Sequence, residues 1–111
     1  MPSSGLLNVP RTQAEWDGWS FNHALEHQKI IQAIQAQTNV NLIQYQLDPI
    51  NFNSITEWLE WHQQTHLDMD GVLGLQSNDL QDVKLDDEKN RESFIYLNWT
   101  EHFAANQVLG V

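Results

Sequence analysis

The chain has 111 residues, enough for one hydrophobic core and too few for two. It carries 15 acidic and 5 basic residues, and the formal charge of −10 argues against nucleic acid and anionic membrane surfaces as partners. There is no cysteine, which excludes disulfides, thiolate chemistry and cysteine-ligated zinc.

Three segments begin with a helix-capping signal and continue with apolar residues at helical spacing. Thr12 and Ser54 are each followed three positions later by a glutamate, which is the capping-box arrangement. Asp86 and Asp87 bring negative charge to the start of a third helix, where it suits the positive end of the helix dipole. The pattern therefore predicts three helices and an all-α fold.

The predicted helices also have recognisable ends. Asn39, Gly74 and Gly110 each suit the left-handed position that follows a helix, although Gly71 is an alternative end for the second one. We expect a single domain over residues 1–111, with helices at about 12–38, 54–73 and 86–109.

The two predicted connectors, 39–53 and 75–85, are long for links between neighbouring helices. The first contains "NLIQYQL", which alternates apolar and polar residues and is expected to run extended. An extended connector covers roughly 35–50 Å, whereas a helix of about 20 residues is about 30 Å long. The chain can therefore return to its starting level, and we favour three parallel helices about an approximate threefold axis over an up-down-up bundle.

A histidine-centred segment recurs along the chain. Residues 58–75 align without a gap on residues 94–111, and "WSFNHALEH" aligns on "WLEWHQQTH" when the histidines are matched. Aligning the first two helices by their caps would shift this register by three residues. On parallel helices the histidine register predicts two inward-facing layers, which are His23/His62/Asn98 and His27/His66/His102.

Two interpretations of these layers stay open. Three imidazoles at one height resemble a transition-metal site, with His27, His66 and His102 as ligands and His23 and His62 around them. We favour a buried hydrogen-bonded network with no metal or other cofactor. Its members would be His23, His27, His62, His66, Asn98 and His102.

Enzyme signatures fit this sequence poorly. "HALEH" has the H-x-x-E-H pattern of a zinc protease family, but a further downstream ligand and a substrate cleft are needed. The chain has no Glu-x-x-His, no Gly-rich phosphate loop and no nucleophile motif. The acidic stretch 78–88 does not match the spacing of an EF-hand and is expected to be a solvated loop. We expect a protein that is not an enzyme.

Aromatic residues collect in the first turns of the predicted helices, and most are expected in the core. Trp61 and Trp99 lie off the apolar stripes, and the chain finishes on the apolar Val111. These three residues are the candidates for binding a partner.

Four stretches, "HALEHQKIIQAI", "WHQQTHLDM", "LGLQSNDLQDV" and "NWTEHFAANQVLG", resemble small acidic proteins encoded among the virion-structure genes of tailed bacteriophages. The resemblance covers most of residues 12–111 and rests on no defined signature. It implies a non-enzymatic protein of the capsid, neck or tail, made in the host cytoplasm and built into the virion in many copies or as a homo-oligomer beside other virion proteins. The alternative is a small bacterial helical binding or regulatory domain, with or without a transition metal in its histidine cluster. The start of the chain lacks a secretory signal, and no apolar run approaches membrane-spanning length.

Overall fold

The computed structural model describes residues 1–45 and 54–111 of the chain. These residues form three long helices, which are α1 (Gln13–Thr38), α2 (Ile55–Leu73) and α3 (Glu88–Leu109). Two short 3₁₀ helices, η1 (Ser4–Leu7) and η2 (Ile43–Tyr45), precede and follow α1. The all-α prediction is confirmed, and the three helices begin and end within two residues of the predicted bounds.

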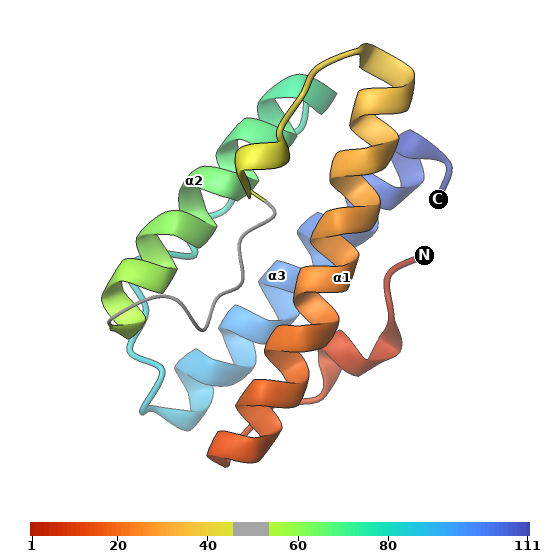
Figure 1. Cartoon of the computed structure of the whole chain (residues 1–111). Helices are drawn as coiled ribbons and strands as arrows, with labels where there is room; N and C mark the ends of the chain where they lie inside the picture. Colours follow the sequence, from red (N-terminus) through yellow and green to blue (C-terminus); the bar gives the residue numbers. More distant parts are fainter. Residues whose placement is uncertain (46–53) are drawn as a thin grey trace.

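All three long helices run in the same direction, so that their first residues lie at one end of the bundle (Figure 1). The chain returns to that end twice, once before α2 and once before α3. This is the expected parallel arrangement, and it places equivalent residues of the three helices at the same height. The N-terminal η1 packs against both α1 and α3.

The predicted caps start each helix. The side chains of Thr12 and Ser54 accept hydrogen bonds from the backbone N–H three positions on, at 3.1 and 3.2 Å. Asp87 accepts from two N–H groups of the first turn of α3. These oxygens satisfy donors that have no partner inside the helix.

The helices end in left-handed residues. Asn39, Gly74 and Gly110 have φ angles of 65°, 70° and 73°. Gly71 lies inside α2, so the earlier of the two possible ends is not used. At φ values near 70° a glycine has no Cβ to strain, and asparagine is among the few other residues that tolerate this region.

The described part of the first connector is not extended. A backbone hydrogen bond of 3.0 Å from Tyr45 to Leu42 closes the 3₁₀ turn η2, and the side chain of Asn41 accepts from the backbone N–H of Ile43. Leu42 is buried in the hydrophobic cluster near the helix ends. The expectation of an extended "NLIQYQL" is therefore wrong for residues 43–45, because a local turn lets Leu42 enter the core. The end of that stretch lies outside the described residues.

The acidic residues of the stretch 78–88 are exposed, as expected for a solvated loop, whereas its apolar residues are buried or half-buried. Leu80, in the middle of the second connector, is fully buried in the core. Its backbone N–H donates to the Oε1 of Gln63 on α2 at 2.5 Å. Val83 and Leu85 pack against the same cluster, and burying a leucine such as Leu80 is worth roughly 1.5–3 kcal/mol, so these apolar side chains hold the connector on the bundle.

The core consists of two hydrophobic clusters with a polar section between them. The cluster near the helix starts contains Leu6, Trp19, Trp58, Leu59, Leu80, Phe94 and Ile95. The cluster near the helix ends contains Ile30, Ile31, Ile34, Leu42, Met69, Ala105 and Leu109. Along each of the three helices, the histidines lie between the residues of the first cluster and those of the second. Among the described residues, none of the helices combines the length and the apolar character that crossing a membrane would require.

Candidate metal centre

One register relates the three helices throughout the core. Residues of α1 and α2 that face each other differ by 39 in sequence number, and those of α2 and α3 differ by 36. The layer at the helix starts is aromatic, with ring centroids of Trp19, Trp58 and Phe94 separated by 6.0–6.1 Å. One helical turn further lie His23, His62 and Asn98, and another turn brings His27, His66 and His102 together. The two predicted layers are thus the ones that the structure contains.

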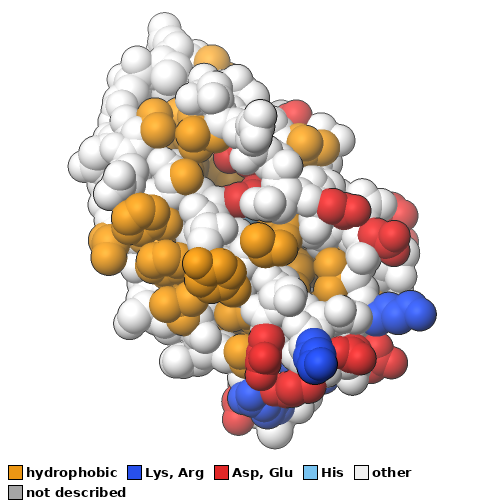
Figure 2. All heavy atoms as spheres, turned by 180° about the vertical axis from the view of Figure 1, so that it is seen from behind, with side chains coloured by type: hydrophobic (Ala, Val, Ile, Leu, Met, Phe, Trp, Pro, Cys, Tyr) orange, Lys and Arg blue, Asp and Glu red, His pale blue; other side chains and the backbone are white. Residues whose placement is uncertain are grey.

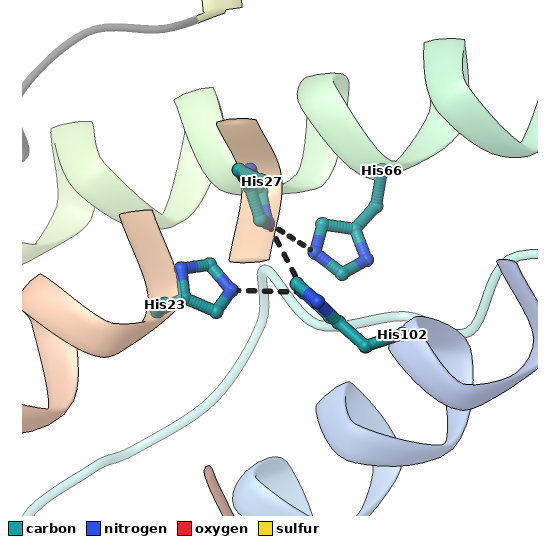
Figure 3. Close-up of side chains that lie close together, drawn as sticks. All are labelled: His23, His27, His66 and His102. Carbon is teal, nitrogen blue, oxygen red and sulfur yellow. Dashed lines mark hydrogen bonds between the residues drawn. The ribbon is translucent and has the colours of Figure 1, made fainter. Parts of the chain in front are cut away.

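The histidine side chains turn the same ring nitrogen, Nε2, toward a common centre. The Nε2 of His27 lies 3.2 Å from that of His66 and 3.1 Å from that of His102. The Nε2 of His23 lies 3.2 Å from that of His102 and also 3.2 Å from that of His62. Figure 3 shows four of these rings converging from the three helices.

Hydrogen bonds alone do not explain all of these short contacts. Four N···N contacts and two contacts to the Oδ1 of Asn98 join the five Nε2 atoms, at 2.8–3.2 Å. A neutral imidazole nitrogen carries either one hydrogen or one lone pair in the ring plane, so each Nε2 forms one good bond. At most three of the six contacts can therefore be hydrogen bonds.

A metal ion would account for the spacing. With metal–nitrogen distances of about 2.0–2.1 Å, neighbouring ligand nitrogens lie about 3.3–3.4 Å apart around a tetrahedral ion and about 2.9 Å apart at right angles. The observed separations of 3.1–3.2 Å fall between these values. One nitrogen from each of four histidines also lies within 4.8 Å of those of the others. These four are His23, His27, His66 and His102.

His62 has a different role from the other four. Its Nε2 lies 2.8 Å from the Oδ1 of Asn98, the shortest contact in the cluster. An amide oxygen only accepts, so His62 carries its hydrogen on Nε2 and has no lone pair there for a metal. The Nε2 of His23, which was expected beside the metal set, lies 3.2 Å from that of His102 and also 3.2 Å from the Oδ1 of Asn98, so its lone pair is available when His62 is the donor to Asn98.

The histidine cluster is buried, and burial favours neutral imidazoles. All five histidines are at most 2% exposed. Burial, and after it the neighbouring imidazoles, lowers the pKa of His23, His27, His62 and His102 well below the usual value, and burial lowers the pKa of His66 to about 3. Neutral imidazole is the form that binds metals, because its lone pair is free.

Apolar layers close both ends of the site. His23 stacks on Trp19 at 4.7 Å between ring centroids, and His62 stacks on Trp58 at 4.6 Å. One helical turn beyond the His27/His66/His102 layer, toward the helix ends, lie Ile30, Met69 and Ala105. A closed site with protein ligands only is the form that structural metal sites take, whereas catalytic sites keep an open position.

Two buried carboxylates beside the cluster were not predicted. The Nδ1 of His66 lies 3.0 Å from the Oε1 of Glu101, and Asp70 lies close enough to form a second potential ligand group with both. The pKa of Asp70 is raised to about 7, chiefly by burial and in addition by Glu101, while the hydrogen bond from Ser77 acts in the opposite direction. The sequence did contain a signal, because Asp70 follows His66 by four positions and therefore shares its helix face.

Two of the three predicted partner-binding residues lie near the helix starts, and the third follows the end of α3. Trp61 and Trp99 are half-buried and pack against the cluster near the helix starts, and the ring of Trp99 stacks on Phe103. Val111 is exposed. The structure does not bring these three residues into one site.

Comparisons with protein-family models, with curated proteins and with solved structures found no match to this chain.

Proposed function

We propose that this protein is a non-enzymatic helical domain whose three parallel helices are tied together by one divalent transition-metal ion. The ligands would be His23, His27, His66 and His102. Three pairs of these Nε2 atoms lie 3.1–3.2 Å apart, and one ring nitrogen from each of the four residues lies within 4.8 Å of the others; this convergence carries the proposal. It departs from the metal-free network that the sequence favoured, because hydrogen bonding can use only half of the short contacts.

The chemistry of the ligands narrows the choice of ion. An all-imidazole set suits zinc, copper, nickel and cobalt, whereas magnesium and calcium prefer oxygen. The ligands come from all three helices, so an ion bound there would link every helix to the other two. Because the metal binds the folded arrangement and not the separated helices, its binding energy stabilises the fold.

The test is metal uptake by the purified full-length protein. After removal of metal with a chelator and addition of Co²⁺ or Zn²⁺, we expect about one ion per chain and a visible Co²⁺ ligand-field spectrum. Stability should rise by about 2.7 kcal/mol when free metal is 100-fold above the Kd. His27→Ala should abolish uptake.

Met69→Ala is the matched control. It removes a buried side chain one turn from the cluster and should lower the unfolding free energy by about 2–5 kcal/mol without changing the metal stoichiometry. Absence of uptake by the wild-type protein across these ions would refute the proposal.

The resemblance to virion proteins supplies a second proposal, namely that the domain is built into a tailed-phage particle beside other virion proteins. Apolar side chains gather on the face formed by the N-terminal segment and α3 (Figure 2). Met1, Leu7, Tyr96 and Val108 are exposed on these elements. Such a surface is what a subunit held by neighbours needs. Quantitative mass spectrometry of purified particles tests this, and absence of the chain from them would end the proposal.

A further inference from the structure

We infer that Glu101 is a positioning residue of the metal centre, which fixes the tautomer of His66 and supplies a buried counter-charge to the bound cation. This inference rests on the proposed metal-binding function and goes beyond it, because Glu101 is not one of the four ligands.

The contact between the two side chains fixes the direction of the His66 lone pair. A carboxylate accepts hydrogen bonds, so the Nδ1 of His66, 3.0 Å from the Oε1 of Glu101, carries the ring hydrogen. The Nε2 of His66 then holds a lone pair, and it faces the Nε2 of His27 at 3.2 Å. Carboxylates that hold metal-binding histidines in this way orient the ring and raise its basicity.

The connector between α2 and α3 holds the other oxygen of Glu101. Both the backbone N–H and the side-chain amide of Asn78 donate to the Oε2 of Glu101, at 2.9 and 3.1 Å. Gln63 on α2 in turn donates to the carbonyl oxygen of Asn78 at 3.0 Å. Glu101 therefore has three hydrogen-bond donors and a supported position, which an incidental surface carboxylate lacks.

Other histidines of the cluster have no such partner. Among the described residues, the buried Nδ1 atoms of His27, His62 and His102 have no hydrogen-bond partner. The tautomer of His62 is set by Asn98 instead, and those of the ligands His27 and His102 are less constrained than that of His66. This contrast identifies His66 as the ligand whose orientation is set before a metal binds.

The local charge also fits a cation. Glu101 is 6% exposed, and within the described part of the chain no lysine or arginine forms an ion pair with it. A buried negative charge without a positive partner is unfavourable. A metal ion on the far side of the His66 ring would offset that charge.

Glu101→Gln tests the inference, with the exposed Glu60→Gln on α2 as the matched control. A glutamine has one oxygen in place of two, so it cannot accept from both His66 and Asn78. We expect Glu101→Gln to weaken Zn²⁺ binding by about 10–100-fold, whereas Glu60→Gln should leave it unchanged.

The ring-nitrogen NMR shifts of His66 in the metal-free protein give a second, independent measurement. They should show the Nδ1–H tautomer in the wild type and a mixture of tautomers in Glu101→Gln. If Glu101→Gln does not fold, Asn78→Ala answers the same two questions, because it removes one donor that holds Glu101 and leaves His66 untouched.

Unchanged Zn²⁺ affinity would overturn the inference, and so would an unchanged tautomer. A wild-type protein that binds no metal would refute the proposed function instead. The NMR shifts would then still decide whether Glu101 sets the tautomer of His66, so the two failures can be told apart.

Discussion

The Nε2 atoms of His27 and His102 lie 3.1 Å apart, although 75 positions separate the two residues in the chain. Both rings are buried, so bulk water does not separate the two nitrogens. Parallel packing of α1 and α3 imposes this proximity. The same packing exposes the fold to acid, because protonation would place like charges in contact.

Stability should fall as the pH falls below about 6.5. The five histidines are neutral in the folded state because their pKa values are lowered, but the unfolded chain takes up protons below pH 6.5. His66, whose folded pKa is about 3, should by itself cost about 2 kcal/mol of stability between pH 7 and pH 5, and the other four act in the same direction. Urea unfolding with chelator present at a series of pH values measures this, and a midpoint that is constant down to pH 5 would contradict it.

Asp70→Asn should stabilise the protein more at pH 8 than at pH 5. The folded pKa of Asp70 is raised to about 7, so its contribution to stability is lost as the pH rises from about 4 to 7. Asparagine is neutral throughout and its oxygen can still accept from Ser77, whose hydroxyl donates to Asp70 at 2.5 Å. We expect a gain on the order of 2 kcal/mol at pH 8. An equal change at both pH values would show that the effect is not electrostatic.

Phe94→Ala should destabilise the bundle by about 3–5 kcal/mol. Phe94 is 1% exposed and belongs to the aromatic layer at the helix starts, with its ring centroid 5.5 Å from that of His62. Chemical denaturation measures the loss. Tyr96→Ala on the exposed side of the same helix is the control, and it should change stability by less than about 1 kcal/mol. Similar losses in the two variants would contradict the proposed packing of Phe94.

Two glycine substitutions should have opposite effects. Gly74 ends α2 with φ at +70°, where alanine is strained by about 1–2 kcal/mol, so Gly74→Ala should lower the melting temperature. Gly18 lies within α1 with open space around the position of a Cβ, and Gly18→Ala should stabilise the protein by about 0.5–1 kcal/mol. Calorimetry on the two variants checks both signs, and a stabilised Gly74→Ala would contradict the left-handed cap.

The positions of the helices and of the histidine layers could be predicted because each depends on short-range spacing. Thr12 and Ser54 mark helix starts by local chemistry, and pairs such as His23/His27 share one face at any helix orientation. The spacing of the histidines also selected the correct one of the two possible registers for the first helix. Trp19, and not Trp16, lies at the level of Trp58, with ring centroids 6.1 Å apart.

Glu101 and Asn78 could not be predicted in the same way. Glu101 lies beside His102 in the chain but contacts His66, 35 positions away, because the bundle turns that side of α3 toward α2. Asn78 depends on the path of an irregular connector, for which hydrophobic periodicity gives no information. The closeness of the Nε2 atoms depends on side-chain rotamers, which a sequence pattern does not specify.

Because the three helices start at one end, their backbone dipoles add and do not cancel. Glu15, Glu57 and Glu88 occupy the first turns and meet the positive end, whereas no basic residue occupies any last turn. The glutamates offset the positive end of the summed dipole, whereas the negative end is left without such compensation. Two copies brought together by the ends at which their helices finish would therefore repel one another.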